Sequence, residues 1–194
     1  FATSTSSASV YILFGSRTND DAVLIEGTSG DDQLTGTGGN LSSNTISEVI
    51  VGLAGDDTLS SSGGFDTLLG GAGDDVFRFT RNEYYLKNGG SKFLLADGGS
   101  GFDTLLVDHR NANPYFRQDS EDIIRLRDIE AIDLRNSGSN LLRLDALTVI
   151  EMTSSANRLR VYRDDDQQVW LGPGWTLTGT SAIQGQRFEA WQNG

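Results

Sequence analysis

Gly52-Leu-Ala-Gly-Asp-Asp-Thr-Leu-Ser60 is followed without a gap by Ser61-Ser-Gly-Gly-Phe-Asp-Thr-Leu-Leu69 and Gly70-Gly-Ala-Gly-Asp-Asp-Val-Phe-Arg78, and the three stretches share one nine-residue frame. Glycine recurs at positions one, two and four, aspartate at position six and a large apolar residue at position eight. The frame also occurs upstream in Gly27-Thr-Ser-Gly-Asp-Asp-Gln-Leu-Thr35 and downstream in Gly98-Gly-Ser-Gly-Phe-Asp-Thr-Leu-Leu106. This repetition indicates a solenoid of short strands and turns.

The residue types at these positions favour a metal-binding turn. Glycine lets the backbone turn through positive φ and brings carbonyl oxygens inward, where a side chain would obstruct them. The aspartate supplies a hard anionic oxygen, and the apolar residue points into the core from a short strand. Calcium takes six to eight oxygen ligands at about 2.3–2.6 Å, so mixed carbonyl and carboxylate ligation suits it. In-phase repetition with an apolar position eight favours this interpretation over a set of solvated Gly-Asp turns.

The pattern G-G-x-G-x-D-x-U-x resembles RTX repeat proteins, which are secreted bacterial proteins whose repeats fold around calcium. The resemblance implies an all-β fold with a parallel β-roll (β-helix) over residues 27–106, interrupted by insertions at 41–47 and 79–97. We interpret residues 79–97 as a hairpin-like excursion that either carries a function specific to this protein or is a variable insertion.

The resemblance also implies that each ion lies between one loop and the loop two repeats on. Asp32 would share an ion with Asp57, and Asp57 a second ion with Asp75. Asp66 would pair with Asp103 if the excursion loops out and the chain returns to the coil.

We therefore expect about three or four calcium ions between stacked loops. The candidate ligands are the acidic side chains at position six and the carbonyls of repeat glycines, namely Asp32, Glu48, Asp57, Asp66, Asp75, Asp103, Gly30, Gly55, Gly64, Gly73 and Gly101. Glu48 stands where the irregular second repeat should carry an aspartate, and its side chain is one methylene longer. The position-five aspartates, Asp31, Asp56 and Asp74, are predicted to face solvent.

Composition agrees with the repeats and excludes several classes of function. The chain has 24 glycines and a net charge of −12, and an acidic surface disfavours nucleic acid and anionic membrane as partners. The absence of cysteine excludes thiol catalysis, disulfides and thiolate zinc sites. No apolar run approaches the roughly 20 residues of a membrane span. The sequence does not open with a signal peptide, so we expect export by another signal or by one outside this segment.

The first 26 residues are predicted to be an N-terminal strand and linker. The apolar run Ser9-Val-Tyr-Ile-Leu-Phe-Gly15 resembles the last strand of an FG-GAP repeat, and it is equally interpretable as a strand that caps the coil. We expect this strand to pack against β structure, either in its own chain or in a neighbouring subunit.

Residues 107–194 are predicted to form a β-rich, β-sandwich-like cap module. Its strands are expected at 123–127, 129–134, 141–145, 158–163, 168–171 and 174–177, with a short helix over 146–152 that Asp145 caps at its N-terminus. The series Ile129-Glu-Ala-Ile-Asp-Leu134, Leu142-Arg-Leu-Asp145 and Gly174-Trp175 resembles the tail that follows RTX repeats in large bacterial surface adhesins. That resemblance implies one further apolar strand after Trp191, without which the sheet would have an open edge.

Catalysis has little support in the sequence, and we expect no enzyme activity. The single histidine, His109, lies between Asp108 and Arg110 and is interpreted as solvated. The chain contains neither a Gly-x-Ser-x-Gly elbow nor a His-Glu-x-x-His motif, and the acidic run 119–122 is interpreted as a solvated face. Three tryptophans and a tyrosine are candidates either for a carbohydrate-stacking surface or for the core: Trp170, Trp175, Trp191 and Tyr162.

The leading hypothesis is a calcium-dependent structural and adhesive module of a secreted bacterial protein at the cell surface or in the extracellular matrix. Passage through a type I secretion channel is implied by the resemblance alone. One alternative makes the chain the RTX tail of a secreted hydrolase or lyase whose catalytic part lies elsewhere. Another makes it a self-assembling filament subunit, in which the N-terminal strand of one subunit completes the open edge of the next.

Overall fold

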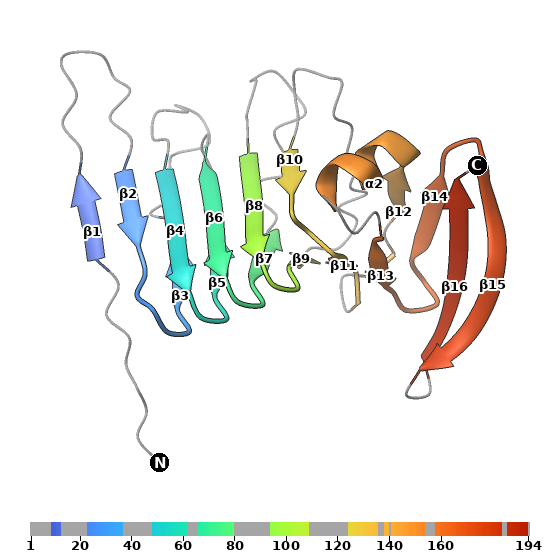
Figure 1. Ribbon diagram of the computed structural model, residues 1–194, viewed down its shortest axis with the longest axis horizontal. Coiled ribbons are helices and arrows are strands. Elements are labelled where there is room, and N and C mark those ends of the chain that lie inside the picture. The colour runs from blue at the N-terminus through green and yellow to red at the C-terminus, as the bar shows by residue number, and fades with distance from the viewer. Residues whose placement is uncertain are drawn as a thin grey trace.

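The chain forms a solenoid of two six-stranded sheets in the computed structural model, which describes residues 9–12, 23–36, 48–61, 66–79, 94–108, 124–135, 138–139, 141–153, 158–183 and 186–193 (Figure 1). The first sheet has the order β1 (Ser9–Ile12), β2 (Val23–Glu26), β4 (Glu48–Ala54), β6 (Thr67–Ala72), β8 (Leu94–Ser100) and β10 (Ile124–Arg127). The second has the order β13 (Arg160–Tyr162), β11 (Ala131–Asp133), β9 (Thr104–Val107), β7 (Val76–Phe79), β5 (Thr58–Ser60) and β3 (Gln33–Thr35). From β2 to β11 successive strands alternate between two parallel sheets, so the predicted parallel β-roll is confirmed.

Each coil contributes one strand to each sheet, and the position-eight residues form the core between them. In the first sheet, register aligns Ile25, Ile50, Leu68, Ala96 and Leu126, all at most 4% exposed. In the second, register aligns Leu34, Leu59, Phe77, Leu105 and Ile132, all at most 2% exposed. These two columns face each other because successive side chains of a strand alternate between its faces.

The length of each coil shows how the repeats are interrupted. The coil from Asp57 to Asp75 takes 18 residues, which is two nine-residue repeats. The coil from Asp32 to Asp57 takes 25 residues. The difference matches the seven residues that the sequence places as an insertion at 41–47, which lie outside the described residues.

The second interruption differs from the predicted excursion. Residues 94–100 form β8, which pairs in parallel with β6 and β10 and is therefore one half of a regular coil. Asp103 consequently lies one coil, 28 residues, after Asp75. The prediction that Asp103 pairs with Asp66 is wrong, because β8 lies between their repeats and shifts Asp103 to the opposite edge of the solenoid.

The N-terminal strand packs on its own chain. β1 pairs antiparallel with β2, with Val10 opposite Ile25. The prediction that this strand packs against β structure is therefore confirmed, and within this chain it caps the first coil.

The C-terminal part begins as a continuation of the solenoid. β10, β11 and β13 extend the two sheets beyond residue 106, where the sequence suggested that a separate module starts. The remaining elements are α2 (Ala146–Met152), a parallel pair β12 (Leu141–Leu144) and β14 (Gln168–Leu171), and an antiparallel hairpin of β15 (Trp175–Ile183) and β16 (Gln186–Asn193). Asp145 caps α2 as predicted, since its Oδ1 accepts a hydrogen bond from the Thr148 N–H at 2.8 Å.

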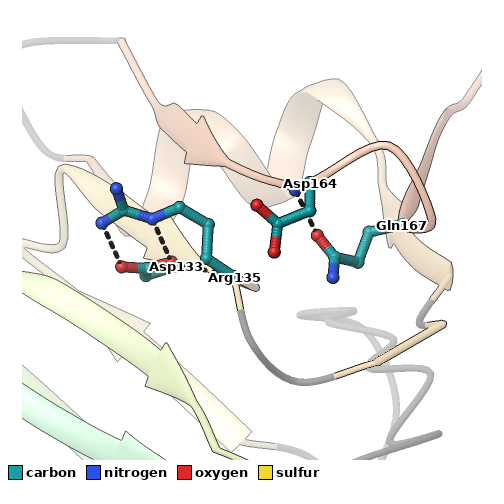
Figure 2. Close-up of polar contacts among 4 residues, drawn as sticks. All are labelled: Asp133, Arg135, Asp164 and Gln167. Carbon is teal, nitrogen blue, oxygen red and sulfur yellow. Dashed lines mark hydrogen bonds and ion pairs between the residues drawn. The ribbon is translucent and has the colours of Figure 1, made fainter. Parts of the chain in front are cut away.

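Hydrogen bonds of polar side chains stabilise the turns at the end of the second sheet (Figure 2). Arg135 binds Asp133 through two hydrogen bonds of 3.0 and 2.7 Å, and its guanidinium lies 4.8 Å from the ring centre of Tyr162 in β13. The hydrogen bonds with Asp133 raise the pKa of Arg135. The buried Gln167 accepts from the Asp164 N–H and donates to the carbonyl of Gly138 at 3.1 Å.

Two of the predicted carbohydrate-stacking residues are exposed. Trp170 and Trp191 are 51% and 43% exposed, whereas Trp175 packs partly buried against the core. Among the described residues, no helix is long and apolar enough to cross a membrane.

Candidate metal centre

Five turns carry the chain from the first sheet to the second along one edge of the solenoid, and those that lead into β3, β5, β7 and β9 lie at the bottom of the view in Figure 1. These four follow the repeat frame, over residues 27–32, 52–57, 70–75 and 98–103. The turns stack through backbone hydrogen bonds, since Gly55 N–H donates to Ala72 O and Gly73 N–H to Ser100 O, at 2.8 and 2.9 Å. Equivalent atoms of successive turns therefore lie next to each other along the solenoid axis.

Glycine is required where the turns approach most closely. Gly73 and Gly101 have φ of +134° and +144°, in the region that side chains disfavour. A Cβ on Gly73 would overlap the carbonyl oxygen of Gly55, and a Cβ on Gly101 that of Gly73. The carbonyls of Gly55 and Gly73 thus pack against the next turn, and the predicted role of the position-four glycines as calcium ligands stays a prediction.

The position-six aspartates form a buried ladder through the stack. The backbone N–H of Asp32 donates to Asp57 Oδ1 at 2.8 Å. In the same way, Asp57 N–H donates to Asp75 Oδ1 and Asp75 N–H to Asp103 Oδ1, both at 2.9 Å. All four side chains are at most 3% exposed. The structure therefore brings together four of the predicted ligands, in neighbouring coils, as the sequence predicted for Asp32, Asp57 and Asp75.

The second carboxylate oxygen of three of these residues has no hydrogen-bond partner. These oxygens are Oδ2 of Asp57, Asp75 and Asp103, and each is buried within the described part of the chain. A buried carboxylate oxygen without a partner costs free energy comparable to the desolvation of the group. Such an oxygen is therefore a candidate to bind a cation.

Each of these oxygens lies where the side chain of a position-one residue would have to stand, so glycine is needed at Gly52, Gly70 and Gly98. A Cβ on Gly52 would lie 2.6 Å from the carbonyl oxygen of Gly70 and would overlap Asp57 Oδ2. A Cβ on Gly70 would lie 2.7 Å from the carbonyl oxygen of Gly98 and would overlap Asp75 Oδ2. One carboxylate oxygen and one carbonyl oxygen of the following coil thus converge at each position-one glycine.

This donor set fits calcium. Hard oxygen donors of mixed carboxylate and carbonyl type are those that calcium takes in proteins. No group of three or more His, Cys, Asp or Glu side chains able to hold a metal is found in the described ranges. An ion bound at these turns would therefore be held by no more than two carboxylates together with backbone carbonyls, which is the mixed ligation expected from the sequence.

The raised pKa values of the buried ladder aspartates also favour a bound cation. Burial, reinforced by neighbouring aspartates, raises the pKa of Asp75 to about 6 and that of Asp103 to about 7. Burial also raises the pKa of Asp57. The metal-free turn stack therefore holds negative charge at a cost that a bound cation would offset.

Two other turns differ from these three in the partner of the aspartate Oδ2. In both of them a hydroxyl group donates a hydrogen bond to this oxygen. Asp32 Oδ2 accepts from the N–H and the hydroxyl of Thr28, at 2.6 and 2.9 Å. Asp66 Oδ2 accepts from the Ser61 hydroxyl, and Asp66 Oδ1 accepts from the Glu48 N–H at 3.0 Å. Burial raises the pKa of Asp66 to about 6. Asp66 and the buried Glu48 therefore lie together on the edge of the solenoid opposite the ladder.

The position-five aspartates form a second ladder at the surface. Asp31, Asp56 and Asp74 are exposed, as predicted. Asp31 Oδ1 accepts from the Asp56 N–H at 2.9 Å, and Asp56 Oδ1 accepts from the Asp74 N–H at 2.8 Å. These residues thus bind the backbone of the next turn, a role that the sequence interpretation missed.

One acidic residue of the ladder lies outside the repeats and was not predicted. Glu130 Oε2 accepts from the Asp103 N–H at 2.8 Å, so Glu130 occupies the position of a fifth aspartate. The signal in the sequence is its place directly before β11, which corresponds to the place of Asp103 before β9. Of the other predicted residues, Gly64 and His109 lie outside the described ranges, as does the acidic run 119–122.

Comparison with known proteins identifies the repeats. The family model for the RTX calcium-binding nonapeptide repeat matches residues 24–40 and 44–79 in four copies. No curated protein and no solved structure matches the chain. These residues therefore match RTX repeats, a type of repeat that binds calcium and typically occurs in secreted bacterial proteins. The match does not extend to the segments that resemble an FG-GAP strand and an adhesin tail, so these resemblances stay predictions.

Proposed function

We propose that the chain is a calcium-dependent structural and adhesive module of a secreted protein at the bacterial cell surface or in the extracellular matrix. The observation that carries the proposal is the set of buried, unpartnered Oδ2 atoms of Asp57, Asp75 and Asp103, each beside a position-one glycine and a carbonyl oxygen of the next coil. Calcium bound there neutralises the negative charge of the buried aspartates and links one coil to the next.

The cross-link joins successive coils. At Gly52, the Asp57 carboxylate oxygen of one coil lies near the Gly70 carbonyl oxygen of the next, and at Gly70 the Asp75 carboxylate oxygen lies near the Gly98 carbonyl oxygen in the same way. An ion that binds both oxygens of such a pair therefore stabilises the contact between coils, and its binding free energy becomes folding free energy. Because each coil contacts chiefly its neighbours, the ions act cooperatively along the stack.

Calcium dependence of this kind suits a secreted protein. Affinities in the range of extracellular modules, roughly 10⁻⁴–10⁻³ M, would leave the stack unoccupied where calcium is scarce and fill it outside the cell. We infer that the chain is exported before it is fully folded, through a type I channel, and that it serves as a rigid scaffold there.

The structure favours this module over a strand-exchanged filament. β1 pairs with β2 of its own chain, and exchange would require these hydrogen bonds to break first. No observation among the described residues favours the hydrolase or lyase tail as a second candidate. We therefore propose a non-enzymatic role.

Substitution of one ladder residue tests the proposal. Asp57→Asn keeps an oxygen that can accept from the Asp32 N–H but removes the charge, while Asp31→Asn removes an exposed charge from the same edge. Calorimetric titration should show calcium uptake by the parent chain at millimolar concentration, weaker uptake and less calcium-induced β structure in Asp57→Asn, and little change in Asp31→Asn. Absence of calcium uptake by the parent chain would disprove the proposed function.

A further inference from the structure

The solenoid continues for one coil beyond the last nonapeptide, and this coil carries an acidic turn without the glycine frame. Arg127 of β10 pairs with Asp97, and Ala131 of β11 pairs with Thr104. Asp128 and Glu130 therefore stand one coil beyond Gly98 and Asp103, at the positions that the frame gives to glycine and aspartate.

Glu130 makes the backbone contact of a ladder aspartate. Its Oε2 accepts from the Asp103 N–H at 2.8 Å, as Asp103 Oδ1 accepts from the Asp75 N–H at 2.9 Å. The N–H groups of Glu130 and Ala131 both donate to the Asp103 carbonyl at 3.0 Å. This turn is therefore in register with the stack, although it is shorter than the repeat turns.

The backbone carbonyl of Asp128 lies beside Gly98 and near the carboxylate of Asp103. A Cβ on Gly98 would overlap both Asp103 Oδ2 and the carbonyl oxygen of Asp128. In the two preceding turns a glycine carbonyl occupies the place that Asp128 O takes here. Asp128 has φ of +49°, which is uncommon for a residue with a side chain and indicates that the packing holds its carbonyl in this orientation.

The charges at this turn match those at the repeat turns. Asp103 is fully buried, and its Oδ2 has no hydrogen-bond partner. Burial raises the pKa of Asp103, and the charges of Asp75 and Glu130 add to this effect. Glu130 Oε2 accepts from the N–H of Asp103 itself, so both carboxylates belong to this turn contact.

We propose that Asp103, Glu130 and the carbonyl of Asp128 hold a divalent cation at the end of the turn stack, outside the matched repeats, and that their oxygen donors favour calcium. This inference rests on the proposed function and extends it. The cation ties β10 and β11 to the repeats, so the C-terminal part of the chain responds to calcium.

The test uses the full chain with three variants and one control. Glu130→Gln keeps an oxygen for the Asp103 N–H and loses only the charge, Asp103→Asn removes the shared carboxylate, and the third variant combines the two. The control, Glu151→Gln, removes an exposed charge from α2. Calcium binding is measured by calorimetric titration, and folding of every variant is verified by circular dichroism in saturating calcium.

We expect Glu130→Gln to weaken one calcium site about tenfold or more and to leave the others unchanged. The double variant should lose no more than Asp103→Asn, because the two carboxylates serve one ion. Calcium should also slow hydrogen exchange of the Ile129 amide, which donates to Met152 O at 2.8 Å, in the parent chain and the control more than in Glu130→Gln.

Two results would overturn the inference and leave the proposed function intact. One is a Glu130→Gln titration that superimposes on that of the parent chain, which would mean that Glu130 only accepts a backbone hydrogen bond. The other is additive loss in the double variant, which would place the two carboxylates at different ions. A parent chain that binds no calcium would instead disprove the proposed function itself.

Discussion

At the scale of single residues, the turns differ in what faces the inner oxygen of the aspartate. Thr28 and Ser61 direct hydroxyls at Oδ2 of Asp32 and Asp66, whereas the same oxygen of Asp57 and Asp75 has no donor. A buried carboxylate that already accepts a hydrogen bond from a hydroxyl is stabilised less by a bound cation than one without a donor. We therefore expect the ions to bind at the glycine turns and the two hydroxyl turns to hold without metal.

Replacing Ser61 separates these two kinds of turn. Ser61→Ala leaves a buried oxygen of Asp66 without its donor, so the free energy of unfolding should fall by about 1–3 kcal/mol. The loss should persist in saturating calcium, and the number of bound ions should not change. Denaturant unfolding and calorimetry measure the two quantities, with Ser100→Ala at an exposed serine as the control. Recovery of the lost stability by calcium would mean that an ion replaces the hydroxyl.

The buried position-six aspartates could be predicted from the sequence, but the hydroxyl donors could not. The frame specifies aspartate at 32, 57, 66, 75 and 103, and all five side chains are buried. Thr28 and Ser61 occupy positions where the frame usually has glycine, so in the sequence they indicate only a departure from the repeat. Each hydroxyl donates a hydrogen bond to the aspartate of its own turn, a contact that depends on the folded turn and not on the frame.

At the scale of elements, the stacked turns tolerate no side chain at position four. Gly73→Ala would place a methyl group on the Gly55 carbonyl oxygen at a φ of +134°. We expect the free energy of unfolding in calcium to fall by about 2–5 kcal/mol, from the left-handed backbone and the overlap together. The matched control is Gly179→Ala in β15, where a Cβ would have no neighbour within 4 Å. Equal denaturation midpoints for the two variants would contradict the stacking.

The strands that carry a strong local pattern were predictable, and the half-coil without one was not. β4 to β7 follow the position-eight apolar residues, and α2 follows its cap at Asp145. β8 has Ala96 at the core position and no aspartate before it, so only its pairing with β6 identifies it as a coil strand. The error about Asp103 and Asp66 arose from that missing signal.

At the scale of the whole molecule, the buried carboxyls make the metal-free fold sensitive to pH. The pKa values of Asp66, Asp75 and Asp103 are raised from 3.8 to about 6, 6 and 7 in the folded chain. The folded state therefore binds more protons than the unfolded state between these values. The stability that the protons contribute is fully present below about pH 4 and is lost as the pH rises through 6 and 7.

In calcium-free buffer, the free energy of unfolding should thus be lower at pH 8 than at pH 5. Calcium affinity should change in the opposite direction, because the ion requires the deprotonated forms of Asp75 and Asp103. Urea unfolding with a chelator and calcium titration at the two pH values measure both trends. A metal-free chain that becomes more stable toward pH 8 would show that these carboxyls are not buried as the structure has them.

The 18-residue coil also sets how far the chain can reach. Neighbouring strands of a sheet lie about 4.8 Å apart, so each coil of the folded solenoid advances along its axis by only that distance. The same residues, pulled straight, span roughly 60 Å. The stretch that we propose is held together by calcium is therefore short when folded. Loss of the ions would allow its coils to unfold, and each unfolded coil could lengthen the distance between the two ends by about ten times its folded length.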